Sequence, residues 1–317
     1  MKDKLKSIFS NDVTIDGNFI YLNDKSIESN QQHTTEAFSE KWTKYSAEDY
    51  IKSFEDFQRR WYLKLYGFET ENNLKEYLQD KKIILDAGCG LGYKAAWFAK
   101  LSPNSLVIGM DFSDSVNVAK ELYKDIPNLY FVRGDIANTG IKSKMLDYVS
   151  CDQVIMHTEY PEITFKHLSD ILISGGEFSC YVYAKKALPR ELLDEHFRSY
   201  TKDLTHQQIW ELSEQMTKLG KMLSELNIEL DFPDMPALGI NGGKQDLQRF
   251  LYWNFFKCFW NKDLGWDTSV STNFDWYSPS NAKRYSEEEY KSLISENNLK
   301  INYFHSEEAC YSGRFLK

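Results

Sequence analysis

The chain has 317 residues, of which 42% are hydrophobic and 27% are charged, and its formal net charge is -9. These are globular proportions, so we expect a folded chain with one large domain, or a core domain with a cap, and no disordered half. Because the balance is acidic and no Lys/Arg cluster stands out, we expect no nucleic-acid partner.

Cysteine usage and hydropathy exclude several further classes of protein. The five cysteines are scattered and form no CxxC pair, which argues against a disulfide framework and against a zinc site. No apolar run reaches the roughly 18–20 residues that span a bilayer. The N-terminal MKDKLKSIFSND lacks the apolar stretch of a signal peptide. We therefore expect a reduced, cytoplasmic protein with no membrane partner, and the oligomeric state stays open.

The first 80 residues read as an N-terminal helical segment. Asp16 and Gly17 favour a short hairpin in an otherwise polar start. From about residue 35 aromatic and apolar residues recur at helical spacing, and they are Phe38, Trp42, Tyr45, Tyr50, Phe54, Phe57, Trp61 and Leu65. Two interpretations of these helices are open: ordinary core packing, or a lid over an active site.

From residue 81 to 187 short apolar runs alternate with helical stretches. The runs end near Asp86, Asp111, Asp135, Asp152 and Tyr183. Helices are predicted between them at about 93–101, 114–124 and 162–173. This order predicts an α/β fold, a Rossmann-like sheet that is mostly parallel with helices on both faces. In such a sheet, ligands bind at the carboxyl ends of the strands.

The alternation stops after Tyr183. Residues 188–262 read as helical, with interruptions at Pro233, Pro236 and Gly242-Gly243. A block of this length is too long for a loop, so we expect residues 188–275 to form an inserted helical cap. Residues 276–317 then complete the core with a helix at 286–297, opened by a capping box, and strands near 299–306 and 309–316.

The strongest motif is Asp86-Ala87-Gly88-Cys89-Gly90-Leu91-Gly92, between a predicted strand and a predicted helix. Glycines at alternate positions let the backbone approach a ligand where a Cβ would clash. The free N–H groups of the following helix can meet a carboxylate. The spacing differs from the GxGxxG of a dinucleotide site, which makes an NAD-dependent oxidoreductase the distant alternative.

Acidic residues at the next two strand ends extend this site. Asp111 lies about 20 residues after the glycines and can accept hydrogen bonds from a ribose diol. Asp135 can accept a bond from an adenine amino group, and Ile136 or Phe112 can pack on the ring. We add Gln153, just after the fourth strand, as a cofactor-binding residue.

These motifs resemble the class I S-adenosylmethionine-dependent methyltransferase family over roughly residues 80–183 and the final hairpin. The resemblance implies a seven-stranded sheet, S-adenosylmethionine as cofactor and S-adenosylhomocysteine as product. It implies that Asp86, Gly88, Cys89 and Gly90 surround the methionine part of the cofactor, and that Asp111 and Asp135 hold the ribose and adenine. The long insert resembles that of a bacterial subgroup.

The methyl acceptor is less well marked. Between Phe250 and Tyr277, eleven of 28 residues are aromatic. They form either a packed cap or a pocket for the acceptor, since aromatic faces stabilise cations such as a sulfonium. We predict Arg190, Trp276 and Tyr277 as substrate-binding residues.

His157 and Tyr183 are the predicted catalytic residues, with His157 as general base or as a structural cap of its loop. We expect no metal, because no cluster of His, Asp and Glu is visible. The favoured function is methyl transfer to an oxygen or nitrogen of a small molecule. The alternatives are methylation of a protein or carbohydrate-linked group, aminopropyl transfer, and cofactor binding without catalysis.

Overall fold

The computed structural model describes residues 2–22, 48–279 and 281–317 and divides the chain into two compact units. Unit 1 is built from residues 1–183 and 283–317, and unit 2 from residues 184–282. The helix expected around Phe38, Trp42 and Tyr45 lies outside the described residues. Within those residues, no helix is both long and apolar enough to cross a membrane.

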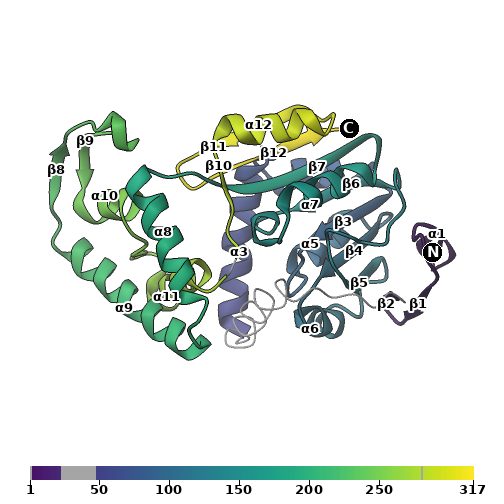
Figure 1. The fold of residues 1–317 in the computed structure, drawn as a ribbon. Coiled ribbons are helices and arrows are strands. Elements are labelled where there is room, and N and C mark those ends of the chain that lie inside the picture. The colour runs from purple at the N-terminus through teal and green to yellow at the C-terminus, as the bar shows by residue number, and fades with distance from the viewer. Residues whose placement is uncertain (1, 23–47, 280) are drawn as a thin grey trace. The chain divides into compact units, whose positions relative to one another are not determined.

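Unit 1 is organised around one sheet, whose strands lie side by side in Figure 1. Their order is β1-β2-β5-β4-β3-β6-β7-β12-β11, and β10 pairs with β7. Their bounds are β1 (Val13–Asp16), β2 (Phe19–Leu22), β3 (Ile83–Ala87), β4 (Leu106–Asp111), β5 (Leu129–Arg133), β6 (Leu146–Cys151), β7 (Leu172–Ala184), β10 (Arg284–Tyr285), β11 (Lys300–Ser306) and β12 (Cys310–Leu316). The strands from β5 to β11 are the seven of a Rossmann-like methyltransferase sheet, so the predicted fold class is confirmed. The N-terminal hairpin and β10 enlarge that sheet to ten strands.

The strand directions and the strand order predict where a ligand binds. β5, β4, β3, β6 and β7 are parallel to their neighbours, whereas β12 is antiparallel to both β7 and β11. The chain passes from β3 to β4 on one side and later to β6 on the other, so the order reverses at β3. Ligands of open α/β sheets bind at such a switch point, beyond the carboxyl ends of the strands.

Helices cover both faces of this sheet. Period-2 alternation divides β3: Ile83 and Leu85 pack in one hydrophobic cluster, and Ile84 packs in the other, on the same face as Asp86. The helices on the face of Asp86 are α3 (Glu48–Leu65), α4 (Glu71–Gln79), α5 (Tyr93–Leu101) and α6 (Ser115–Leu122). Those on the opposite face are α1 (Lys2–Ser7), α7 (Pro161–Asp170) and α12 (Glu287–Glu296).

One boundary in unit 1 was predicted wrongly. The helix expected at 162–173 ends at Asp170, and β7 begins at Leu172, so Ser174-Gly175-Gly176 lies inside the strand. Gly175 has φ +81, which a strand of L-residues rarely adopts. The glycine pair, a turn signal in sequence, is here an irregularity within a long strand.

Unit 2 contains four α-helices and a small hairpin. Its elements are α8 (Leu188–Thr201), α9 (His206–Glu225), β8 (Glu229–Phe232), the 3-10 turn η2 (Pro236–Leu238), β9 (Gly243–Asp246), α10 (Leu247–Asn254) and α11 (Gly265–Tyr277). The prediction of helix over 188–262, with interruptions at Pro233, Pro236 and Gly242-Gly243, is wrong for the antiparallel pair β8 and β9, whose connecting turn contains the two prolines. α9 and α11 pack through the stacked rings of Trp210 and Phe274, whose centroids are 3.7 Å apart.

Candidate cofactor and active site

The glycine-rich turn lies at the carboxyl end of β3. Its start is held to β4, because the backbone N–H groups of Gly88 and Cys89 both donate to the carbonyl of Met110, at 2.8 and 3.0 Å. Gly88 has φ +80, and a Cβ there would lie 2.4 Å from the methyl carbons of Val154. Protein packing therefore requires this glycine in addition to any ligand.

Asp86, the last polar residue of β3, is buried, with the backbone N–H of Ala95 and the charge of Lys94 near its carboxylate. Asp86 is 1% exposed, and neither of its carboxylate oxygens has a hydrogen bond of normal geometry. Burial raises the pKa of Asp86 to about 6, although the charge of Lys94 opposes that rise. A buried carboxylate of this kind costs free energy unless a cation or donor meets it. It is the observation in this unit that points most directly to a bound cationic group.

Lys94 and Asp152 lie on the same face as Asp86. Lys94 is in the first turn of α5, and its Nζ lies 2.7 Å from Asp152 Oδ2. Tyr66 donates its hydroxyl to Asp152 Oδ1 at 2.8 Å. Burial, the largest single influence, lowers the pKa of Lys94, but the negative charges of Asp152 and Asp86, the Tyr93 hydroxyl and the hydrogen bond to Asp152 together outweigh burial and raise that pKa. Asp86, Asp152 and Lys94 together carry one excess negative charge at neutral pH, which favours a cation beside Asp86.

Asp111 ends β4 and joins the glycine-rich turn to the next loop. Its Oδ2 accepts from the backbone N–H of Gly90 at 2.8 Å. Its Oδ1 accepts from the backbone N–H of Ser113 at 2.8 Å and from the Ser113 hydroxyl at 2.6 Å. The following Phe112 is half-buried. Since an ionised carboxylate offers about four acceptor sites, Asp111 retains room for a hydroxyl of a ribose.

Asp135 and Ile136 follow β5 at the same edge of the sheet. Asp135 Oδ1 accepts from the backbone N–H of Ala137 at 2.8 Å, and the residue is half-buried. Ile136 is 5% exposed and packs in the cluster on the opposite face from Asp86. The three carboxylates expected to hold the cofactor thus end β3 and β4 or follow β5, which are adjacent parallel strands.

Gln153 lies just past β6 and contacts a residue that sequence reasoning missed. Its amide donates to Gln58 Oε1 at 3.2 Å, and the Tyr93 hydroxyl donates to the same oxygen at 3.2 Å. Gln153 has φ +64, a strained value for a side chain of its size. Gln58, Tyr62 and Tyr66 form one buried stripe of α3 at i, i+4 and i+8. The available signal was this polar residue in a helical stripe that continues into two buried tyrosines.

His157 and Tyr183 are brought together near the carboxyl ends of β6 and β7. His157 ends a 3-10 turn, η1 (Ile155–His157), after β6, and it is 5% exposed. Its Nε2 lies 3.3 Å from the hydroxyl of Tyr183 near the end of β7. The two rings meet edge to face at 5.5 Å between centroids. Both therefore lie at the carboxyl edge of neighbouring parallel strands.

The predicted substrate residues Arg190, Trp276 and Tyr277 lie in the interior of unit 2. Arg190 Nε lies 2.8 Å from Asp194 Oδ2, and its guanidinium also contacts the ring of Trp276 at 5.1 Å. The Trp276 indole donates to Asp194 Oδ1 at 2.9 Å, and Tyr277 donates to the carbonyl of Lys257 at 2.7 Å. These contacts within unit 2 explain why all three residues are buried. That they also bind the acceptor remains a prediction.

Comparison with known proteins gives a family match and several similar sequences. A family model described as a methyltransferase domain matches residues 78–248, more than half of the chain. The chain is 31% identical over 104 residues to malonyl-[acyl-carrier protein] O-methyltransferase 1 of Ilyobacter polytropus, which is 32% of this chain and 38% of that protein. It is 31% identical over 110 residues to the demethylmenaquinone methyltransferase of Staphylococcus saprophyticus, 33% of this chain and 46% of that protein. The chain thus spans less than half the length of these relatives.

Among solved structures, the chain is similar to the magnesium protoporphyrin IX methyltransferase of Synechocystis PCC 6803 with bound S-adenosylhomocysteine. The TM-score is 0.49 and the sequence identity 13%, over 91% of this chain and all of that one.

Proposed function

The chain belongs to the methyltransferase domain family, and from that membership we propose that it transfers a methyl group from S-adenosylmethionine to an oxygen or nitrogen of a small-molecule acceptor. The single observation that carries the cofactor assignment is the buried carboxylate of Asp86, without a hydrogen bond of normal geometry, beside the glycine-rich turn. The amino-acid end of S-adenosylmethionine carries an ammonium group, which matches that carboxylate.

The residues of unit 1 fit the rest of the cofactor. Asp111 has an acceptor site left for a ribose hydroxyl. Asp135 and Ile136 lie one strand further along the same edge, where an adenine ring would follow its ribose. Gln153 and the turn at Gly88 and Gly90 border the methionine part. Each assignment rests on the position of the residue at this edge and on the hydrogen bonds that its atoms can donate or accept.

When bound, S-adenosylmethionine supplies a methyl group on a positively charged sulfur, which a lone pair of the acceptor displaces in line. What the chain must do is bind, align and exclude water. If the acceptor loses a proton, His157 is placed to take it, since an imidazole titrates near neutrality. Tyr183 would orient that ring through the contact between its hydroxyl and His157 Nε2.

A small-molecule acceptor is supported by relatives rather than by geometry. The two curated relatives are named for malonyl-[acyl-carrier protein] and for demethylmenaquinone. We propose that the acceptor belongs to one of these chemical classes, a small acid or a reduced ring with a hydroxyl. The first screen should therefore hold thioester-linked diacids and hydroquinones together.

Calorimetric titration with S-adenosylhomocysteine tests the cofactor, with NAD as the control ligand. Micromolar or tighter binding of the first and none of the second is expected. Absence of binding, or a preference for NAD, would contradict the proposal.

His157→Ala and Tyr183→Phe test the acceptor side by methyl transfer to whichever acceptor the screen identifies. Both variants should keep wild-type affinity for S-adenosylhomocysteine. His157→Ala should lower kcat by about a hundredfold or more if the acceptor must lose a proton. An unchanged kcat would return His157 to a structural role.

A further inference from the structure

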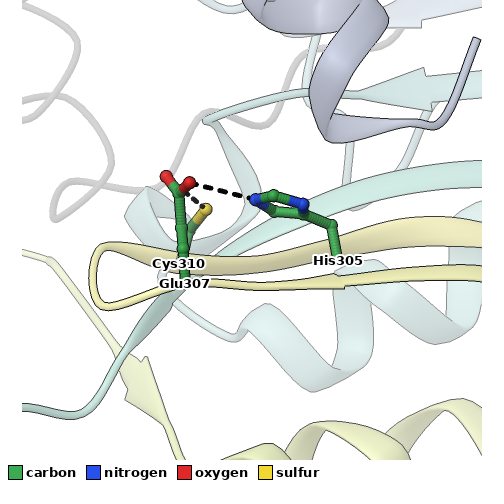
Figure 2. A group of neighbouring side chains, drawn as sticks. All are labelled: His305, Glu307 and Cys310. Atoms are coloured by element: carbon green, nitrogen blue, oxygen red, sulfur yellow. Dashed lines mark hydrogen bonds and ion pairs between the residues drawn. The ribbon is translucent and has the colours of Figure 1, made fainter. Parts of the chain in front are cut away.

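The turn between β11 and β12 gathers three different metal-binding side chains. His305 is near the end of β11, Cys310 begins β12, and Glu307 lies in the turn between them (Figure 2). One ligand atom from each residue lies within 4.8 Å of the other two. An imidazole nitrogen, a thiol sulfur and a carboxylate oxygen are the three donor types that zinc accepts in proteins.

The hairpin register explains why these side chains meet. The backbones of Glu307 and Cys310 close the turn by two reciprocal hydrogen bonds of 3.0 and 3.1 Å. His305 is opposite Ser312 in the ladder, and Ser312 is two residues from Cys310. Because side chains two apart on a strand share a face, His305 and Cys310 project to the same side of the hairpin.

We propose that His305, Glu307 and Cys310 form a zinc site. His305 Nε2 lies 3.0 Å from Glu307 Oε2, and Cys310 Sγ lies 3.7 Å from Glu307 Oε1. Zinc bonds of about 2.0–2.3 Å place tetrahedral ligand atoms roughly 3.3–3.8 Å apart. The two separations are close to this range, and the three ligand atoms all lie within 4.8 Å of one another, so a bound ion would draw them together by about 1 Å at most.

A displaceable cation already sits at this carboxylate. Lys64 Nζ lies 3.1 Å from Glu307 Oε2, and the Lys64 side chain is 62% exposed. The lysine can swing into solvent at little cost when a divalent ion enters, because exposed ion pairs contribute little stability. Lys64 therefore competes with the metal for Glu307. Its removal should affect Zn²⁺ affinity only if Glu307 is a ligand.

The site would be structural and independent of the proposed methyl transfer. Cys310 is buried and pairs with Tyr183 in the ladder between β12 and β7. Zinc binding would convert the thiol to a thiolate and release its proton to solvent. The ion would then join the end of β11, the turn and the start of β12, which is the strand that pairs with β7, with a water completing the fourth position.

The test uses the full chain, stripped with a chelator and titrated with Zn²⁺, and separately with Co²⁺ as a spectroscopic probe. We expect one equivalent of Zn²⁺ to bind and to raise Tm. Co²⁺ should give the intense thiolate charge-transfer band of a cysteine ligand. His305→Ala, Glu307→Gln and Cys310→Ser should each weaken Zn²⁺ binding by at least about tenfold, which is the lower end of the loss from an outer-sphere partner alone. Lys64→Gln should strengthen binding.

Matched controls are the exposed His196 and the buried Cys258 of unit 2. His196→Ala and Cys258→Ser remove the same side chains elsewhere and should leave Zn²⁺ affinity unchanged. His305 and Glu307 are partly exposed, so their variants keep the test valid even if Cys310→Ser does not fold. Absence of stoichiometric binding, or binding insensitive to His305→Ala and Glu307→Gln, would each overturn the site.

Discussion

Lys94 and Asp152 form an ion pair of 2.7 Å in the interior, with side chains that are 8% and 1% exposed. One comes from the helix after the glycine-rich turn, and the other follows β6, so the pair joins the two sides of the switch point in the sheet. Removing one partner leaves the other charge buried and unpaired.

We therefore expect Lys94→Met to lower the free energy of unfolding by about 3–5 kcal/mol. Asp152→Asn should cost a similar amount. The double variant should lose markedly less free energy of unfolding than the sum of the two single losses, because neither charge is then left unpaired. Urea denaturation of the four proteins closes this cycle. Additive losses would show that the two charges do not interact.

Asp86→Asn should change how stability depends on pH. Because burial raises the pKa of Asp86 to about 6 from 3.8, the folded state binds more protons than the unfolded state between these values. The free energy of unfolding should therefore fall as pH rises through that window, by up to about 3 kcal/mol for this group. Without cofactor, Asp86→Asn should be more stable than wild type at neutral pH and should bind S-adenosylhomocysteine more weakly.

The measurement is denaturation of both proteins at about pH 4 and about pH 7.5, since the difference between them isolates this group. Asp125→Asn, at an exposed carboxylate, is the control and should change neither quantity. An Asp86→Asn protein that is less stable than wild type at neutral pH would show that the carboxylate has a stabilising partner.

Gly88→Ala should destabilise the protein for two separable reasons. The positive φ costs a non-glycine residue about 1–3 kcal/mol, and the new Cβ meets Val154 at 2.4 Å. Gly175→Ala is the matched control, because Gly175 has φ +81 with nothing within 4 Å. Thermal denaturation should show a larger loss at Gly88, and Val154→Ala should recover part of that excess. Equal losses of stability at the two glycines would mean that the Val154 side chain moves aside at no cost.

Asp111→Ala should raise the Kd for S-adenosylhomocysteine by about ten- to a hundredfold, the value of one or two charged hydrogen bonds. It removes an acceptor for ribose and also releases the N–H of Gly90. Ser113→Ala removes one hydrogen bond to the same carboxylate and serves as the control, with a much smaller effect. Calorimetry that finds wild-type affinity in Asp111→Ala would remove this residue from the site.

Local patterns predicted the core of unit 1 well. The family match confirms the methyltransferase class that the glycine-rich motif and later acidic residues indicated. The helix expected at 93–101 has the bounds of α5, and the capping box of Ser286 and Glu289 is present. Such features depend on neighbours in sequence, where apolar period and capping chemistry are strong signals.

Contacts between distant residues could not be predicted in this way. Nothing near Lys94 indicates that it meets Asp152, because the other residues of α5 are apolar or aromatic except Lys100. The prediction of helix was wrong for β8 although Leu230 and Phe232 alternate with acidic residues as in a strand, because the run is short and directly follows a long helical pattern. The sequence of β9, Gly243–Asp246, has no apolar residue and therefore no strand signal. The cluster of His305, Glu307 and Cys310 has no standard ligand spacing, and only the strand register brings it together.

The pairing of β10 with β7 has a consequence for how this chain can be engineered. The chain leaves unit 1 at the end of β7 and returns through β10 on a neighbouring strand, so the two points of departure and return are adjacent. An insertion attached in this way is modular, since its removal needs only a short linker between strands that already pair. Swapping unit 2 between relatives, with β7 and β10 kept as fixed ends, would thus test the prediction that this unit binds the acceptor.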